Sequence, residues 1–149
     1  MHGLNILFVC TGNTCRSPMA EAILSNKQLP NVKVKSAGVF AMDGQHASSH
    51  AQSVLSENQI QHWHRSKLLT EADLQWASYI FTMTSSHKET ILQYFPNAAD
   101  KVFTMKEFAG EGQHDIIDPF GGAVEIYRKT FQDLEQTVDK IIEKLNLED

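Results

Sequence analysis

Residues 9–18 read VCTGNTCRSP and join a short apolar run to a segment with helical spacing. The apolar run, residues 5–9, has the length and composition of one buried strand. Small polar residues follow it. Ser17 and Pro18 then form a typical helix start, a capping hydroxyl before a proline at the first helical position. We therefore expect a tight loop between a buried strand and a helix.

Segments typical of strands and of helices alternate along the rest of the chain. Further strands are predicted at 32–34, 78–84 and 102–103, and helices at 46–58, 68–77, 85–95 and 123–147. Val32 and Val34 alternate with lysines, which places their strand near a sheet edge. Thr70 is expected to cap its helix, with Asp73 at the third helical position. The predicted fold class is α/β, a single three-layer domain over residues 1–149 with a short central parallel sheet and helices on both faces.

The composition is that of one ordinary globular domain in a reducing compartment. The chain has 149 residues, of which 42% are hydrophobic and 21% charged, and its net charge of -5 with scattered lysines and arginines argues against nucleic acid as a partner. The apolar run near the start lacks a basic region and is too short for a signal peptide, and no segment approaches the roughly 20 apolar residues of a membrane span. Two cysteines, Cys10 and Cys15, do not make a disulfide framework. We expect a cytoplasmic monomer without membrane contact.

The seven histidines do not indicate a metal site. None has a cysteine or an acidic residue at a spacing typical of metal ligands. His62 and His64 in the segment HWH would point to one side of a strand, but zinc usually has three or four protein ligands. We interpret this segment as a strand end or loop with one useful hydrogen bond, and we expect no metal and no cofactor.

Loop 10–16, with the sequence CTGNTCR, has the composition of a phosphate cradle. It follows the first strand, at the sheet edge where functional loops of α/β proteins lie. The N–H groups of a tight loop that enters a helix can converge on an anion, and the helix dipole adds to the attraction. Gly12 and Asn13 tolerate the positive φ that such a loop can need, and the Arg16 guanidinium matches two phosphoryl oxygens. The nucleotide-binding pattern GxxxxGK[ST] is absent from the sequence.

Cys10 at the base of this loop indicates catalysis in addition to binding. A thiolate aimed at phosphorus is a nucleophile, and the loop amides, the helix dipole and the arginine favour the thiolate form. Ser17 can also donate a hydrogen bond to the sulfur. The alternative is that Cys10 is a small buried residue that ends a strand. Its position between a strand and a helix favours the nucleophile.

Four segments resemble the low molecular weight protein tyrosine phosphatases. They are VCTGNTCRSPMAEA at 9–22, SAGVFA at 36–41, MTSSHK at 83–88 and DPFGG at 118–122. They occur in the order of the family, and the resemblance extends over most of the chain. It implies a small α/β domain with a phosphate-binding loop after the first strand, and a metal-free hydrolysis through a phosphocysteine on Cys10.

The resemblance also assigns a general acid to Asp118-Pro119. A leaving group needs a proton, and the proline can hold the carboxylate at a fixed reach. Asp115 is the rival but lacks the proline, and the alternative for Asp118 is a turn residue. In the implied reaction Cys10 attacks phosphorus while Asp118 protonates the leaving group. Asp118 then activates water to release phosphate, while Arg16 and the loop amides stabilise the phosphoryl oxygens.

Further site residues are implied by the same resemblance. Substrate binding is assigned to Thr11, Gly12, Asn13, Thr14, Cys15, Phe40 and Phe120, and support of the loop to Ser17, Ser36 and His64. Asn13 and Ser36 would brace the loop by hydrogen bonds. The two phenylalanines would form apolar walls of the substrate slot, and the alternative is that they belong to the core. Cys15 can form a reversible disulfide with Cys10, and its alternative is a buried thiol.

Two features favour phosphoarginine over phosphotyrosine as the substrate. Tyrosine-specific members have a bulky aliphatic residue after the nucleophile and one or more tyrosines after Asp-Pro, whereas this chain has Thr11 and Phe120-Gly-Gly. The pattern is similar to the bacterial protein-arginine phosphatase branch of the family. A threonine suits a polar, planar guanidinium, and Asp118 can bind that group and protonate its nitrogen. The expected partners are phosphorylated proteins, in opposition to a protein kinase. The alternative is a protein-tyrosine phosphatase.

Two other protein classes share parts of this pattern. Thioredoxin-coupled arsenate reductases have the same fold and loop but need further cysteines downstream, and none follows Cys15. A non-catalytic phosphoresidue binder would not need Cys10 and Asp118 together. Both classes are therefore less favoured than a phosphatase.

Overall fold

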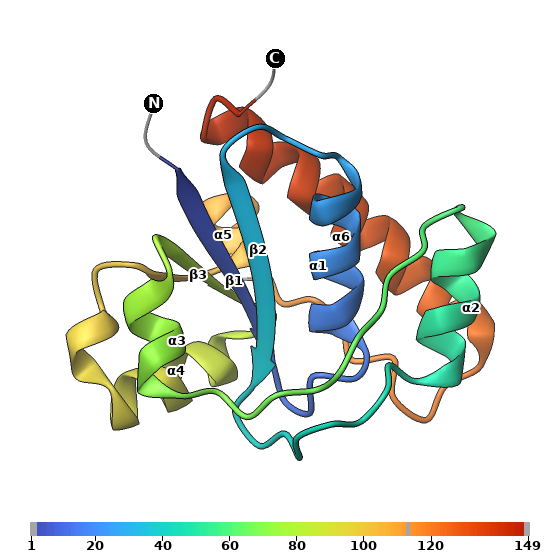
Figure 1. Cartoon of the computed structure of the whole chain (residues 1–149), viewed down its shortest axis with the longest axis horizontal. Helices are drawn as coiled ribbons and strands as arrows, with labels where there is room; N and C mark the ends of the chain where they lie inside the picture. Colours follow the sequence, from blue (N-terminus) through green and yellow to red (C-terminus); the bar gives the residue numbers. More distant parts are fainter. Residues whose placement is uncertain (1–2, 113, 148–149) are drawn as a thin grey trace.

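Four parallel strands form the central sheet of the chain (Figure 1). The computed structural model describes residues 3–112 and 114–147. The strands are β1 (Leu4–Cys10), β2 (Val32–Gly38), β3 (Tyr79–Thr82) and β4 (Val102–Thr104). Their order is β2-β1-β3-β4, and every neighbouring pair is parallel. The predicted short parallel sheet is confirmed, and so is the edge position of the strand that contains Val32 and Val34.

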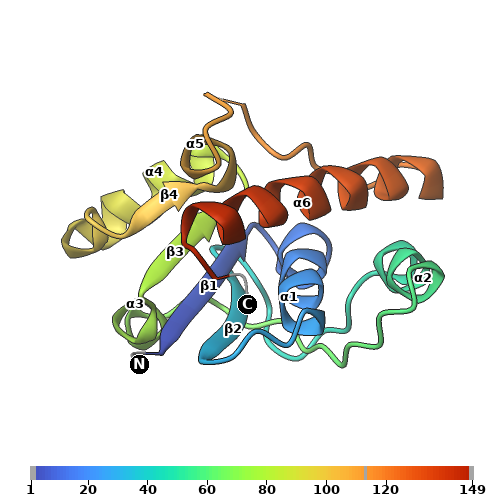
Figure 2. The same cartoon turned by 90° about the horizontal axis from the view of Figure 1, so that it is seen from above.

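Helices cover both faces of this sheet. They are α1 (Arg16–Asn26), α2 (Ser49–Glu57), α3 (Glu71–Trp76), α4 (Ser85–Tyr94), α5 (Met105–Phe108) and α6 (Val124–Lys144), with a 3-10 helix η1 (Pro96–Ala98). Figures 1 and 2 show α1 and α6 on one side of the sheet and α3 and α4 on the other, which confirms the three-layer prediction. Within the described residues, none of these helices is both long enough and apolar enough to span a bilayer.

The central strand β1 is buried on both faces. Ile6 and Phe8 belong to the apolar cluster that contains residues of α1 and α6, whereas Leu7 and Val9 belong to a second cluster with residues of α3 and α4. Successive side chains of a strand point to opposite faces, so an unbroken apolar run supplies both clusters. This strand therefore holds the start of loop 10–16 firmly in the middle of the molecule.

The end of β2 lies directly beside the loop. Cys10 pairs with Gly38 in the parallel ladder. A Cβ atom on Gly38 would lie 2.4 Å from the carbonyl oxygen of Thr11 and 2.9 Å from the nitrogen of Asn13. A glycine is therefore required here by close packing between β2 and the loop.

The first helix begins earlier than predicted. α1 starts at Arg16, and its N-cap is Cys15, which makes no side-chain capping bond. The prediction of Ser17 as cap and Pro18 as first helical residue is wrong, because the loop backbone itself turns into the helix. Pro18 is tolerated in the first turn because the N–H groups there have no acceptor within the helix.

The other boundaries agree more closely with the sequence. Thr70 and Asp73 form the predicted capping box of α3. α6 lies within the predicted range 123–147. The helix predicted from His46 begins only after Ser48, whose side chain accepts a hydrogen bond from the Ala51 N–H. Helices α5 and η1 were not predicted, because three or four residues carry no helical periodicity.

Candidate active site

The carbonyl groups of loop 10–16 hold it in place by hydrogen bonds to the surrounding segments of the chain. The carbonyl oxygens of residues 10, 11, 13, 14 and 15 accept hydrogen bonds from the N–H groups of Val39, Phe40, Ser48 and Met19 and from the ring of His64. In the described part of the chain, the backbone N–H groups of residues 11–16 donate to no other protein group. N–H groups at the start of a helix that donate to no protein acceptor can together bind an anion.

Asn13 fixes the shape of the loop. It is fully buried and has a φ of 57°, in the left-handed region. Its amide nitrogen donates to Ser17 Oγ at 2.8 Å and to Ser36 Oγ at 2.9 Å, and its amide oxygen accepts from the Lys67 N–H at 2.9 Å. Asn13 and Ser36 thus take part in hydrogen bonds that brace the loop, as expected. Of the two loop residues that tolerate a positive φ, Asn13 adopts it and Gly12 does not.

Cys10 lies at the base of the loop with its thiol almost enclosed. The residue is 3% exposed, and its Sγ lies 2.8 Å from Ser17 Oγ. Because Ser17 Oγ already accepts from the Asn13 amide, its own proton is available to the sulfur. The sulfur at the base of the loop therefore has a hydrogen-bond donor from the first turn of α1.

Arg16 is buried, and both terminal nitrogens of its guanidinium have a protein group nearby. Its Nη1 donates to the carbonyl oxygen of Ile116 at 2.9 Å, and its Nη2 lies 3.7 Å from Asp118 Oδ2. The planar fork is therefore held by a backbone group that lies 100 residues away in the chain. A fixed fork loses little conformational entropy when it binds two oxygens of a phosphoryl group.

The two candidate acids have different surroundings. The side chain of Asp118 is 53% exposed and reaches the cavity above the loop, and its Oδ1 accepts from the Phe120 N–H at 3.0 Å. Asp118 thus begins a turn and also lines the cavity. Asp115 Oδ1 accepts from the N–H of Ser85, the first residue of α4. Asp115 therefore accepts a hydrogen bond at the N-terminus of α4, whereas Asp118 is the carboxylate beside Arg16.

A cavity of about 250 Å³ lies over the loop. It is lined by Cys10, Thr11, Gly12, Thr14, Cys15, Arg16, Asp118 and Phe120. Phe120 is 78% exposed at its rim, as a substrate-slot wall requires. Phe40 is 68% exposed but is not among the lining residues, so the predicted pairing of the two rings as walls of this cavity is not seen. Asn13 lies behind the loop instead of in the cavity.

Thr11 has a partner that the sequence did not reveal. Its Oγ1 lies 2.8 Å from Nε2 of His87, at the third position of α4. Burial, and then the positive charge of Arg16, lowers the pKa of His87 to about 4. The ring is therefore neutral at pH 7 and holds the threonine hydroxyl in place on the cavity wall. The segment MTSSHK contained this histidine, but only the fold places it against Thr11.

A hydrogen-bonded group supports the loop from behind. His64 Nε2 lies 2.7 Å from the carbonyl oxygen of Asn13, and Ser36 donates to Glu21 Oε1. Burial lowers the pKa of His64, although the hydrogen bond to Asn13 opposes this effect. His62 Nε2 lies 3.1 Å from Glu21 Oε2. The segment HWH is a loop with a useful hydrogen bond, as interpreted, whereas the part played by Glu21 was missed.

Cys15 is in contact with the N-cap residue of α2 and with a residue of α6. It is 7% exposed, and its Sγ lies 3.5 Å from Ser48 Oγ and 3.4 Å from the hydroxyl of Tyr127. Both cysteines are free thiols. Cys15 thus has the surroundings of a buried thiol while it also lines the cavity that contains Cys10.

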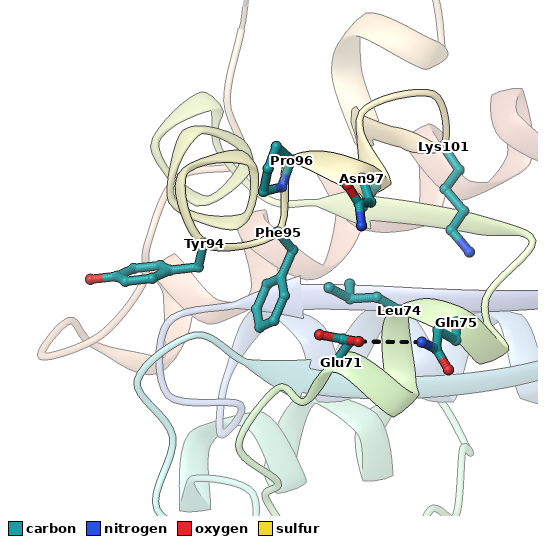
Figure 3. A pocket seen from close by; sticks show the side chains of 9 residues that line it. Glu71, Leu74, Gln75, Tyr94, Phe95, Pro96, Asn97 and Lys101 are labelled. Carbon is teal, nitrogen blue, oxygen red and sulfur yellow. Dashed lines mark hydrogen bonds between the residues drawn. The ribbon is translucent and has the colours of Figure 1, made fainter.

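A second hollow lies on the other face of the molecule and contains no such groups. Figure 3 shows it between α3 and the end of α4, with a volume of about 260 Å³. Leu74 and Phe95 line it, and Glu71 accepts a hydrogen bond from Gln75 on the exposed surface of α3. No cysteine or histidine is among its lining residues, whereas both cysteines of the chain line the cavity over loop 10–16.

Comparison with known proteins agrees with this arrangement. The chain is 54% identical over 143 residues to a protein-arginine-phosphatase of Geobacillus stearothermophilus, with 96% of this chain and 97% of the relative covered. The solved structure of the YwlE arginine phosphatase from that organism matches 96% of this chain and 93% of its own with a TM-score of 0.94. The low molecular weight protein-tyrosine-phosphatase PtpB of Staphylococcus aureus is 41% identical, with 93% of this chain and 96% of the relative covered.

A family description fits almost the whole chain. Residues 5–149 match the low molecular weight phosphotyrosine protein phosphatases. The match includes the loop, the Asp-Pro segment and every strand and helix between them. With the geometry of Cys10, Arg16 and Asp118, it leads to one conclusion: this chain belongs to the low molecular weight phosphotyrosine protein phosphatase family, whose members are cysteine-dependent phosphatases.

Proposed function

We propose that the chain is a protein-arginine phosphatase, which hydrolyses phosphoarginine in proteins through a phosphocysteine intermediate. The observation that carries the proposal is the Thr11 hydroxyl, held 2.8 Å from the neutral His87 ring on the wall of the cavity. Threonine oxygen has two lone pairs and one proton. Whichever tautomer His87 adopts, at least one lone pair of Thr11 is left to accept an N–H of a guanidinium.

The first step transfers the phosphoryl group to Cys10. The phosphate enters the cavity, where the N–H groups of loop 10–16 and the Arg16 fork bind its oxygens. The Cys10 thiolate attacks phosphorus, and an S–P bond forms as the P–N bond to the arginine side chain breaks. Asp118 gives its proton to the leaving nitrogen. The arginine side chain departs as a neutral guanidine, or as a guanidinium cation if the guanidine group of the substrate was already protonated.

The second step releases phosphate. Asp118, now a carboxylate, takes a proton from a water molecule that attacks the phosphocysteine. The S–P bond breaks, and the Cys10 thiolate is restored with the Ser17 hydroxyl 2.8 Å from its sulfur. Arg16 and the loop N–H groups stabilise the equatorial oxygens in both steps. All catalytic groups in this scheme belong to the chain, and the other reactants are the phosphoarginine and the water molecule.

The relatives support the choice of arginine. Two protein-arginine-phosphatases are 54% and 43% identical to this chain over nearly all of it, whereas PtpB, a protein-tyrosine-phosphatase, is 41% identical. A solved YwlE arginine phosphatase with a phosphorylated active-site serine is 43% identical, with a TM-score of 0.91 and 96% of each chain covered. A phosphorylated side chain at the active site of that protein fits the phosphocysteine proposed for Cys10.

The test compares phosphate release from matched phosphoarginine and phosphotyrosine peptides. Wild type is expected to prefer phosphoarginine, and Thr11→Ile is expected to shift kcat/KM toward phosphotyrosine by at least about 10-fold, because the aliphatic side chain accepts no hydrogen bond and packs on an aryl ring. Thr90→Ile is the matched control, since its hydroxyl bonds to the Ser86 carbonyl on the surface of α4. A wild type that prefers phosphotyrosine would support tyrosine phosphatase activity in place of this proposal.

We also propose that oxidation regulates the enzyme. Cys10 and Cys15 line the same cavity as free thiols. A peroxide would oxidise the two thiols to a disulfide and be reduced to water, and a thiol reductant would reverse the change. Reactivation after peroxide treatment is expected in wild type and not in Cys15→Ser. Equal recovery of both proteins would contradict the disulfide.

The cellular setting is part of the same proposal. We propose a cytoplasmic monomer that acts on phosphorylated proteins and opposes a protein kinase. The two free thiols fit a reducing compartment, and the net charge of -5 does not favour nucleic acid. Sedimentation of the purified chain tests the monomer, and a dimer at micromolar concentration would contradict it.

A further inference from the structure

Glu21, His62 and His64 bring three metal-binding side chains together behind loop 10–16. Their ligand atoms all lie within 4.8 Å of one another, and His62 Nε2 is 3.1 Å from Glu21 Oε2. The ligand atoms of a tetrahedral zinc site lie roughly 3.3 Å apart, as follows from bond lengths of about 2.0–2.1 Å. One of the three pairs already has this spacing, and the others need side-chain shifts of about 1.5 Å or less to reach it.

We propose that Glu21, His62 and His64 form a binding site for Zn²⁺ that is separate from the catalytic cavity. Two imidazoles and one carboxylate are a ligand set that zinc takes with an open fourth position. Imidazole donors favour zinc over magnesium or calcium, which prefer oxygen ligands. The sequence did not suggest the site because Glu21 lies 41 residues before His62.

The hydrogen bonds around the cluster are those of a metal site. The carbonyl oxygen of Asn13 can only accept, so the proton of His64 lies on Nε2 and the lone pair for a metal lies on Nδ1. Histidine ligands of metals almost always donate their other N–H to such a group. Glu21 likewise has one oxygen, Oε1, bonded to Ser36 and the other beside His62. Each ligand is therefore oriented by a second contact or by its neighbour.

An opening to the cluster is present. A cavity of about 200 Å³ between α1 and α2 is lined by His62 and His64, together with Pro18, Gln52 and Gln61. The side chains of His62 and Glu21 are 14% and 18% exposed. An ion can reach the cluster through this cavity, and a water molecule can take the fourth position there.

The site is connected to loop 10–16 by two hydrogen-bonded paths. One runs from His64 to the carbonyl oxygen of Asn13, and the other from Glu21 through Ser36 to the Asn13 side chain. A cation on His64 Nδ1 would polarise the Nε2–H bond and strengthen its contact with Asn13. Bound Zn²⁺ is thus expected to stabilise the loop from behind, away from the cavity.

The test measures Zn²⁺ binding to the full chain by competition with a chromophoric chelator. Cys10→Ser and Cys15→Ser are introduced together, so that the thiols do not bind the metal. We expect one Zn²⁺ per chain, and a melting temperature raised by about 5–10 °C when free Zn²⁺ is 100-fold above its Kd. Both readouts are independent of the substrate, so failure of the proposed phosphatase activity would not be mistaken for failure of this site.

Two variants locate the metal. In the same background, His62→Gln keeps a hydrogen-bond donor beside Glu21 but removes the imidazole, and it is expected to weaken Zn²⁺ binding by roughly 100-fold or more. His46→Gln is the control, because His46 is an exposed histidine whose neighbour is Arg65. If His62→Gln shows no cooperative melting transition in the presence of a chelator, the variant is not folded. Glu21→Gln then replaces it, with the same expected loss of Zn²⁺ binding. Binding that is absent in the parent, or as tight in the variant as in the parent, would overturn the proposal.

Discussion

Replacement of Asn13 by alanine tests how the active-site loop is held. The change removes three hydrogen bonds of a buried side chain, to Ser17, Ser36 and the Lys67 N–H. Each contributes about 1 kcal/mol to the free energy of unfolding, and alanine in the left-handed region costs about 1 kcal/mol more. We expect a total loss of about 4 kcal/mol, which lowers the melting temperature of a chain of this length by about 8–16 °C.

The assay is urea unfolding at fixed pH, together with phosphate release. Asn31→Ala is the matched control, because Asn31 has a φ of 63° but is exposed and makes no side-chain hydrogen bond within the described residues. Its expected cost is about 1 kcal/mol, from the backbone conformation alone. Asn13→Gly should be about 1 kcal/mol milder than Asn13→Ala.

Phosphate release by Asn13→Ala is expected to fall by roughly 100-fold or more, because the loop N–H groups lose their common direction. The reasoning is refuted if Asn13→Ala is no more destabilising than Asn31→Ala. A stability loss without a loss of phosphate release would show that Asn13 holds the fold and not the anion site.

Three other changes probe the site. Asp118→Asn is expected to lower turnover of phosphoarginine by about 10²–10⁴-fold, whereas Asp115→Asn retains turnover, and stopped-flow phosphate release distinguishes them. The unfolded chain binds more protons than the folded one between the ordinary pKa of His87, 6.5, and its folded pKa of about 4, so stability present above pH 6.5 is lost as the pH falls toward 4. The loss amounts to at most about 3 kcal/mol, and urea unfolding of His87→Gln at pH 7 and 4.5 should lack it. Gly38→Ala should destabilise the chain by about 3 kcal/mol and reduce phosphate release, because its Cβ would overlap the Thr11 carbonyl. Gly12→Ala is the control, because its Cβ meets only Thr14 Oγ1 at 3.8 Å. It should change the free energy of unfolding by less than about 1 kcal/mol.

The parts of the site that are local in sequence were predictable. A buried apolar run followed by small polar residues indicated that Cys10 ends a strand and that Arg16 lies near a helix start. The hydrogen bond between Ser17 and Cys10 was also anticipated, since both belong to one short segment. The position of the helix start was wrong by two residues, because the turn residues contain no signal for where helical dihedral angles begin.

The contacts between distant segments were not predictable from one sequence. His87 meets Thr11, and the carbonyl group of Ile116 meets Arg16, only because parallel strands bring their carboxyl ends to one edge of the sheet. A backbone carbonyl has no residue-type signature at all. Phe40 is placed beside the loop by the bond from its N–H to the Thr11 carbonyl, but its exposed ring is not among the residues that line the cavity.

The hydrogen bond between Arg16 and the Ile116 carbonyl has a consequence for biosynthesis. Arg16 precedes its acceptor by 100 residues, and that acceptor follows the four strands of the described sheet. Asp118 follows two residues after that acceptor. A nascent chain on the ribosome therefore has the nucleophile and the loop long before it has a fixed guanidinium or an acid. Hydrolytic activity therefore requires a chain that has been extended past Asp118, and until then the reactive thiol lacks its partners.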